Sequence, residues 1–472
     1  MAVARLKAGV AEIDITPQPG PVLAGELESR VSTGISTPLM AKALALSDGQ
    51  TTLALVTLDL FGLQREAADL LIQRIALEAG GGLRPEALMV VCSHTREGPS
   101  TPHGGTPPPR RRVRQAGPSG ATTPVVGQAQ VAGKYTRFVE SCNGEYTREV
   151  AAKAADAVGL ALAMLEDASL GLGYAVLPHL IFNHRLMTRN RKAITAWMGV
   201  PRDEVLEPEG PIDPQFSVFV VRDGRGHPVC LLWSFAADLR YDSGNPLHDS
   251  TNRVYFPAGE NAAHISAGLP YYVQQAVDER IGRHVPSLYL SGCGGDVSFT
   301  HGLERSADAV ASAVMAVQLE TPCDPVIRLG CARERVILPI RDYSQFWSRH
   351  DIELKYPQAV EAFAREVTLL QAQGAHAVPA AVQAFRLGRF ALVGLPGLAF
   401  AGLALDIKGS SPAKGTVVAG NLDGQAGYLL PRAAFDHGGF EAWPSRSSPV
   451  GAGGAEFVSE VANSLLRGLW RG

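Results

Sequence analysis

The stretch "LYLSGCGGDVSFTHG" (residues 288–302) joins a short apolar run to a turn with three glycines, an aspartate and a serine within seven residues. The apolar run has the length and composition of a strand buried on both faces of an α/β sheet. Glycine permits positive φ, and successive N–H groups in such a turn can bind an anion. We therefore expect a strand-to-helix turn that presents Ser298 as a nucleophile beside an anion-binding nest.

The spacing of this turn leaves a structural alternative open. It does not match the G-x-S-x-G elbow of the α/β-hydrolases. Aspartate is also a favoured N-cap residue, so Asp296 could serve only to begin the helix that follows the turn. In that case Ser298 would be an ordinary turn residue.

Other apolar runs of similar length alternate with amphipathic helical patterns along the chain. The runs are at 53–62, 87–95, 229–238, 389–397 and 416–424, and the helical patterns are at 65–80, 146–167, 271–285, 306–320 and 357–374. This alternation predicts an α/β fold with mixed β-sheets flanked by helices. We expect a single catalytic domain that spans residues 1–472.

The composition excludes several classes of protein. With 46% hydrophobic and 19% charged residues and a net charge of −3, the chain is typical of a globular protein rather than a nucleic-acid or membrane-surface binder. No apolar stretch approaches the ~18 residues of a membrane span, and residues 1–20 lack the apolar run of a secretory signal. The six cysteines form no CxxC pair, so we expect free thiols and a cytoplasmic location.

Residues 99–132 interrupt the alternation. This segment is dense in Pro, Gly, Ser and Thr and has four arginines between positions 110 and 114. It lacks the apolar residues that would offset the entropy of ordering, so we expect a mobile loop. Because it directly follows His94, a lid is favoured over a nucleic-acid patch, which would need interleaved aromatic residues.

Polar residues follow several of the apolar runs. In open α/β sheets the ligand site lies beyond the carboxyl ends of the strands, so His94, Asp238 and Ser298 should converge, together with Tyr428. His94 is either structural or a metal ligand, since neutral imidazole is the commonest ligand. Asp238 either caps a turn or acts as a metal ligand or base.

Two further segments contain polar residues of interest. Arg185, with Asn183, begins a basic segment that is either solvated at the surface or anchors an anionic or carbonyl group. Tyr428 lies in a loop after another apolar run, where a tyrosine usually packs with its hydroxyl satisfied.

Five segments together resemble one known family. They are "AGVAEIDITPQPG" (8–20), "SHTREGP" (93–99), "GCGGDVS" (292–298), "FRLGRFALVGLPG" (385–397) and "NLDGQAGYLLP" (421–431). In this order they resemble the amino-terminal catalytic domain of the neutral/alkaline, non-lysosomal ceramidases, from about residue 9 to the last helix. The resemblance does not include the secretion signal or the carboxyl-terminal immunoglobulin-like domain of the better-known members.

The resemblance implies an amide hydrolase. The family hydrolyses N-acyl sphingosines with a zinc ion and the serine of the Gly-Asp-Val-Ser turn, which corresponds to Ser298. His94 corresponds to a zinc-binding histidine, and Tyr428 to a tyrosine that is a ligand or lies near one. Arg185 corresponds loosely to an active-site arginine.

The chain departs from the family at four positions. Arg96 replaces a histidine, and Asp238 replaces another zinc-binding histidine. Leu398 replaces a glutamate ligand, and Phe440 replaces a second active-site tyrosine. Four protein donors are usual for a closed zinc site, and leucine cannot supply one.

Two versions of the site follow from these departures. His94, Asp238 and Tyr428 could hold Zn²⁺ weakly or with an altered metal preference. Alternatively, Arg96 supplies the positive charge near the carbonyl oxygen of the substrate.

We predict a hydrolase that acts on the amide bond of a small soluble N-acyl substrate. A biosynthetic pathway would suit such an enzyme, and we expect no nucleic-acid partner. The alternatives are an amide-forming acyl transferase and a non-catalytic, ligand-binding descendant. The sequence does not define the oligomeric state. The predicted catalytic residues are Ser298, Asp296, Arg96 and Arg185, and the predicted substrate-binding residues are Gly294, Gly295 and Phe440.

Overall fold

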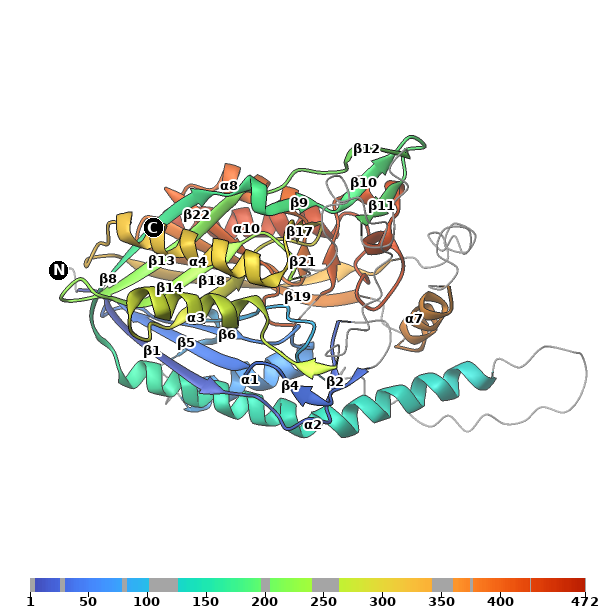
Figure 1. The fold of residues 1–472 in the computed structure, drawn as a ribbon, viewed down its shortest axis with the longest axis horizontal. Coiled ribbons are helices and arrows are strands. Elements are labelled where there is room, and N and C mark those ends of the chain that lie inside the picture. Colours follow the sequence, from blue (N-terminus) through green and yellow to red (C-terminus); the bar gives the residue numbers. More distant parts are fainter. Residues whose placement is uncertain are drawn as a thin grey trace, which may run out of the picture.

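A large mixed β-sheet forms the centre of the molecule (Figure 1). The computed structural model describes residues 5–25, 30–78, 83–101, 126–196, 204–239, 263–341, 360–373, 377–424 and 426–471. The sheet order is β16-β14-β13-β8-β1-β5-β6-β7, with β6–β7 and β14–β16 parallel and the other pairs antiparallel. Its strands are β1 (Lys7–Asp14), β5 (Met40–Ser47), β6 (Thr52–Leu58), β7 (Leu88–Cys92), β8 (Glu166–Val176), β13 (Gln215–Asp223), β14 (Pro228–Phe235) and β16 (Ser287–Ser291).

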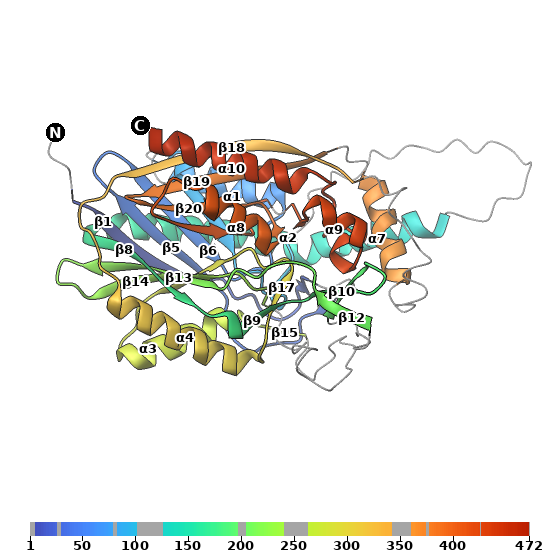
Figure 2. The same ribbon diagram turned by 90° about the horizontal axis from the view of Figure 1, so that it is seen from above.

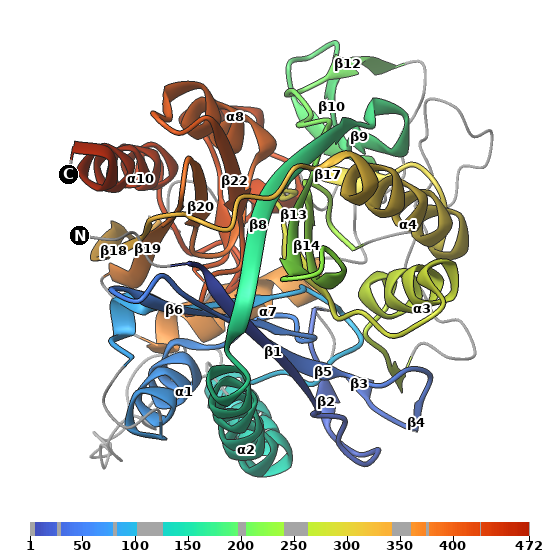
Figure 3. The ribbon, with the colours of Figure 1, turned by 90° about the vertical axis from the view of Figure 1, so that its left-hand side faces the viewer.

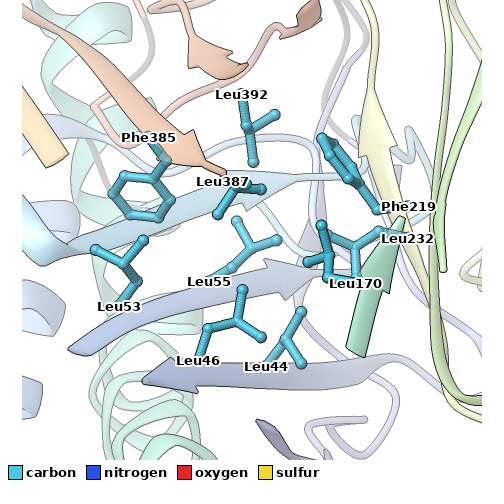
Figure 4. A pocket seen from close by; sticks show the side chains of 10 residues that line it. All are labelled: Leu44, Leu46, Leu53, Leu55, Leu170, Phe219, Leu232, Phe385, Leu387 and Leu392. Atoms are coloured by element: carbon cyan, nitrogen blue, oxygen red, sulfur yellow. The ribbon is translucent and has the colours of Figure 1, made fainter. Parts of the chain in front are cut away.

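A four-stranded sheet packs against one face of the large sheet. It has the order β18-β19-β20-β22, formed by β18 (Leu329–Pro339), β19 (Ala377–Leu387), β20 (Phe390–Gly394) and β22 (Gly415–Ala419). Figure 4 shows the apolar side chains between the sheets, such as Leu44 and Leu55 opposite Phe385 and Leu392. Because strand side chains alternate between faces, the neighbouring Ala384 of β19 packs on the opposite side of the small sheet.

Helices cover the outer faces of both sheets (Figures 2 and 3). Helices α1 (Arg65–Glu78) and α2 (Val126–Ala163) pack together beside β1 and β5. Helices α3 (Leu269–Ile281) and α4 (Leu303–Glu320) cover β13 and β14, and α8 (Ala401–Ser410) and α10 (Gly454–Arg471) cover the small sheet. Gly9 lets α2 approach β1, because a Cβ there would lie 2.0 Å from the Ala161 carbonyl oxygen.

Short elements complete the described part of the chain. Two-stranded pairs are formed by β2 (Val22–Leu23) with β3 (Arg30–Val31), β4 (Gly34–Ile35) with β15 (His264–Ile265), β9 (Ile181–Asn183) with β17 (Val297–Phe299), and β21 (Leu398–Ala399) with β23 (Tyr428–Leu429). Strands β11 (Ala193–Thr195), β10 (Arg185–Thr188) and β12 (Val205–Pro208) form a three-stranded sheet. The remaining helices include α7 (Val360–Gln373) and α9 (Arg432–His437).

The predicted α/β class is confirmed. All six apolar runs form strands, and each predicted amphipathic pattern contains a helix. At the two ends of the expected loop 99–132, Pro99 forms a bridge with Leu23 of β2, and residues 126–132 belong to helix α2. Residues 102–125, with the arginine cluster and the expected lid, lie outside the described residues.

The thiol prediction is confirmed for the cysteines whose side chains are described. The free thiols are Cys92, Cys230, Cys293, Cys323 and Cys331. Across the described ranges, we find no helix that combines the length and the hydrophobicity needed to cross a membrane.

Candidate active site

The ends of strands from both sheets meet at one place. The Cys92 N–H, at the end of β7, donates to the Asn421 carbonyl just beyond β22 (3.2 Å). The Gly420 N–H donates to the Ser291 carbonyl at the end of β16 (2.7 Å). Strands β7 and β16 are the two edges of the large sheet, so the sheet curls until both edges contact the end of β22. The expected convergence of strand ends is therefore found.

The turn after β16 differs from the expected strand-to-helix elbow. Ser298 lies in the middle of the short strand β17, opposite Phe182 of β9. Helix α4 begins only at Leu303. The prediction that Ser298 opens a helix is therefore wrong, because pairing with β9 keeps this segment extended.

The glycines of this turn are required for close packing rather than for positive φ. Gly292, Gly294 and Gly295 all lie outside the positive-φ region. A Cβ on Gly294 would lie 2.5 Å from the Ala237 carbonyl carbon. The Gly294 N–H donates to the Gly292 carbonyl and the Gly295 N–H donates to the Ala399 carbonyl, each at 2.9 Å. These two donors are engaged within the protein, so the expected nest built from Gly294 and Gly295 is not formed.

Asp296 caps a helix, but not the helix that follows it in sequence. Its Oδ1 accepts the Ala401 N–H at the start of α8 (2.8 Å), and its Oδ2 accepts the Asn183 amide N–H (2.8 Å). Burial raises the pKa of Asp296 to about 7, although both hydrogen bonds favour the charged form. The side chain thus connects the Ser298 turn to α8 and β9.

Ser298, His184 and Glu441 form a buried triad. The Ser298 Oγ lies 2.8 Å from the His184 Nδ1, and the His184 Nε2 lies 3.2 Å from the Glu441 Oε1. His184 follows β9, the strand paired with β17, and its N–H donates to the Asp296 carbonyl (2.9 Å). Ser298 on β17, His184 just after the paired strand β9, and Glu441 near the carboxyl end of the chain therefore meet in one place.

The charges around the triad define the protonation of His184. Burial alone would raise the pKa of Glu441, but Arg185 and His184 lower it to about 2, so Glu441 is a carboxylate. Burial lowers the pKa of His184 below its ordinary value. An ionised carboxylate only accepts hydrogen bonds, so we assign the imidazole proton to Nε2. The Nδ1 atom is then free to accept the Ser298 hydroxyl proton.

Arg185 supports Glu441 instead of lying at the surface. Its Nη1 donates to the Glu441 Oε2 (2.5 Å), and its Nη2 donates to Glu209 (2.9 Å) and to the Gly438 carbonyl (2.7 Å). Burial would lower the pKa of Arg185, but the two carboxylates raise it. Thr195 also donates to the Glu441 Oε2 (3.1 Å). The guanidinium is fully buried and engaged by the protein, which corrects the solvated interpretation, while its role in anchoring substrate stays a prediction.

A second polar cluster surrounds Asp238. The His94 Nδ1 lies 2.9 Å from its Oδ1, and the Arg96 Nη2 lies 2.7 Å from its Oδ2. Phe61 packs against both side chains: its ring centroid is 4.0 Å from that of His94 and 5.7 Å from the Arg96 Cζ. His94 has a φ of 67°, a conformation that is strained for a residue with a Cβ.

The two clusters adjoin through the backbone. Asp238 and Ser298 form a parallel β bridge, and the Asp238 N–H donates to the Val297 carbonyl (2.8 Å). The charge of Asp238 also acts on His184, whose pKa it raises in part against the larger effect of burial. Of the four residues predicted to converge, His94, Asp238 and Ser298 therefore occupy one site, and His184 and Glu441 join them.

The donor set does not fit the zinc ion that the resemblance implies. Within the described residues, no three His, Cys, Asp or Glu side chains are grouped to hold a metal ion. Both Asp238 oxygens are already engaged, one by His94 and one by the cation of Arg96. Leu398, where the resemblance implies a ligand, is buried on β21 and cannot coordinate.

The other predicted residues, Tyr428 and Phe440, lie in the carboxyl-terminal segment of the chain. Tyr428 is buried on β23, paired with Leu398, and its role as a ligand stays a prediction. Phe440 is half-buried and packs against Phe363 and Trp443, with ring centroids 5.8 and 6.3 Å away. Its role in binding substrate also stays a prediction, although it immediately precedes Glu441.

Comparison with known proteins identifies the fold. No protein-family model and no curated protein matches this chain. A solved ceramidase complexed with C2 has a TM-score of 0.71 at 14% sequence identity, covering 99% of this chain and 76% of that chain. The neutral ceramidase of Pseudomonas aeruginosa has a TM-score of 0.67 at 14% identity, covering 99% and 74%. The chain has a ceramidase fold.

Sequence reasoning missed two residues of this ceramidase-fold site. His184 stands between Asn183 and Arg185, and Glu441 follows Phe440 in "GGFEAW". A carboxylate among aromatic residues must be paired if it is buried, and this was the available signal for Glu441. His184 follows a strand of only three residues, which is too short for a periodic pattern.

Proposed function

We propose that the protein is a serine-dependent hydrolase of N-acyl amides. The single observation that carries the proposal is the 2.8 Å contact between the Ser298 Oγ and the His184 Nδ1. Nucleophile and base within hydrogen-bond reach, with the base oriented by a third group, is the recurring arrangement of acyl-transfer enzymes. Glu441 is that third group, at 3.2 Å from the His184 Nε2.

The chemistry follows from these contacts. As the Ser298 Oγ bonds to the amide carbonyl carbon, its proton moves to the His184 Nδ1. Glu441 stabilises the imidazolium that results, because its carboxylate lies beside Nε2. His184 then protonates the amine nitrogen as the C–N bond breaks, leaving an acyl group on Ser298. Water, deprotonated by the same histidine, attacks the acyl group and releases a carboxylic acid.

The substrate class is supported by two considerations. Proteins with the same fold are ceramidases by name, and ceramide contains an N-acyl amide bond. Ser298, His184 and Glu441 are each no more than 1% exposed, which favours a compact substrate over a long acyl chain. We therefore propose a small soluble N-acyl amide as the substrate.

Amide-forming acyl transfer is the second candidate. An acyl-serine in a site that excludes water survives long enough for an amine to attack it. The burial of Ser298 favours this outcome over hydrolysis by bulk water. Both candidates share the first half-reaction and differ only in the acceptor.

The test uses p-nitroacetanilide and its long-chain analogue p-nitrodecananilide, whose cleavage releases p-nitroaniline. We expect turnover of the short anilide, with a loss of at least ~10³-fold in Ser298→Ala. Ser306→Ala is the matched control, because Ser306 is also buried but donates to the His301 carbonyl (3.0 Å), away from the triad. Equal rates in wild type and Ser298→Ala would refute the nucleophile. Absence of turnover with a panel of anilides and amine acceptors would favour the non-catalytic, ligand-binding alternative.

A further inference from the structure

We infer that the guanidinium of Arg96 takes the place of a catalytic metal ion, so that this site stabilises the substrate oxyanion without zinc. The inference rests on the proposed function for its chemistry. It rests on contacts of His94, Arg96 and Asp238 for its geometry.

Both carboxylate oxygens of Asp238 are bound by side chains of this protein. Its Oδ1 lies 2.9 Å from the His94 Nδ1, and its Oδ2 accepts the Arg96 Nη2 at 2.7 Å. A buried carboxylate requires a compensating charge, and Asp238 is only 5% exposed. Arg96 supplies that charge, so a metal ion at Asp238 would have to displace the guanidinium and leave it without its carboxylate.

The position of Arg96 is built by its surroundings. Its Nη1 donates to the Gly25 carbonyl (2.7 Å), and its side chain is only 13% exposed. Gly25 has a φ of +85°, and a Cβ at this position would lie 2.8 Å from the Arg96 Cγ. Glycine is therefore required where the chain passes the arginine. Phe61 lies beneath the guanidinium, which adds a cation–π contribution.

Asp238 links the cation to the nucleophile. Asp238, which binds Arg96, forms a parallel bridge with Ser298. A fixed positive charge in the same site can stabilise the negative charge that develops on the carbonyl oxygen of the substrate. The engaged N–H groups of Gly294 and Gly295 do not supply this stabilisation. Arginine cannot lose its charge at ordinary pH, so the cation is permanent.

The first test measures metal rather than activity. Full-length protein, purified without chelator, is analysed by mass spectrometry for metals and by thermal unfolding with zinc or with EDTA. We expect substoichiometric zinc and an unfolding temperature that neither addition changes. One zinc per chain, with destabilisation by EDTA, would overturn the inference.

A restoring substitution provides the second readout. Arg96→His removes the competing cation and adds an imidazole beside His94 and Asp238, so we expect this variant to gain one zinc per chain and a higher unfolding temperature with zinc. Arg389→His is the control, because Arg389 lies over Phe390, on the small sheet. If neither variant binds zinc or is stabilised by it, Arg96 does not occupy a metal position and the inference fails.

The covalent probe diisopropyl fluorophosphate separates this inference from the proposed function. Removing the oxyanion donor should slow labelling of Ser298 about 10²–10³-fold in Arg96→Gln, with partial recovery in Arg96→Lys. Rapid labelling of a zinc-loaded wild type would defeat the inference and leave the proposed function standing. A zinc-free wild type that is never labelled would defeat the proposed function while the metal-free geometry stands.

Discussion

Asp238 and Ser298 lie side by side in a parallel β bridge, and this pairing joins two polar clusters into one site. On the Asp238 side are His94 and the cation of Arg96. On the Ser298 side is His184, oriented toward Glu441. A base therefore contacts the Ser298 hydroxyl, and a permanent cation is bound to the carboxylate of the residue that pairs with Ser298.

Glu441→Gln should lower kcat by about 10²–10⁴-fold with a smaller change in KM. A neutral amide can donate to His184, which favours the tautomer protonated on Nδ1 and blocks proton transfer from Ser298. Steady-state kinetics with p-nitroacetanilide would measure this. The substitution also removes a charge that faces Arg185, so the variant is assayed below its own unfolding temperature. Wild-type kcat in a folded Glu441→Gln would show that Glu441 has only a structural role.

The pH profile should show an acid limb below the ordinary histidine pKa of about 6.5. Burial lowers the pKa of His184, so the imidazole stays neutral until the pH falls below its ordinary value. Activity should be constant around neutral pH and decrease as the pH falls through the lowered pKa. The unfolded chain takes up this proton first, so the stability contributed by His184 is present above pH ~6.5 and is lost as the pH falls. The profile of kcat/KM measures the free enzyme, and an acid limb centred above 6.5 would contradict the assignment.

Gly294→Ala should abolish activity and strongly destabilise the fold. The new Cβ would lie 2.5 Å from the Ala237 carbonyl carbon and 2.6 Å from the Asp238 nitrogen, so Asp238 must move away from the turn. Gly302→Ala is the matched control, because nothing lies within 4 Å of its Cβ position and its φ is −61°. We expect a decrease of a few °C or less for Gly302→Ala in thermal unfolding. Similar unfolding temperatures for the two variants would contradict the close-packing role.

Asp296→Asn should remove a pH dependence of stability. The pKa of Asp296 is raised from 3.8 to about 7, chiefly by burial, so its contribution is fully present below pH ~3.8 and is lost as the pH rises toward 7. One proton gives at most about 1.4 kcal/mol per pH unit in the free energy of unfolding. Urea unfolding between pH 4 and 7 should show a less negative slope in Asp296→Asn than in wild type. Identical slopes would mean that Asp296 is not a buried acid.

The fold was largely predictable because its strands are short, apolar and buried on both faces. Their ends identified His94, Asp238 and Ser298, since the ligand site of open α/β sheets lies beyond the carboxyl ends of the strands. The contacts that complete the site depend on pairings between distant segments. Asp296 caps a helix 105 positions away, and such a partner leaves no local signal in the sequence.

The glycines of the turn illustrate a second limit. The sequence indicates that a turn needs glycine but not whether the reason is positive φ or a close neighbour. Gly294 is required by Ala237, which belongs to another segment. The predicted nest at Gly294 and Gly295 was wrong for this reason, while Ser298 itself lies within the site.

Labelling of Ser298 tests the central claim most directly. Diisopropyl fluorophosphate is added to wild type, Ser298→Ala and His184→Ala, and the modified residue is located by peptide mass spectrometry. We predict one label per chain on Ser298 in wild type, none in Ser298→Ala, and labelling at least ~10²-fold slower in His184→Ala. A wild type that hydrolyses p-nitroacetanilide but carries no label on Ser298, or is labelled equally fast without His184, would contradict the account.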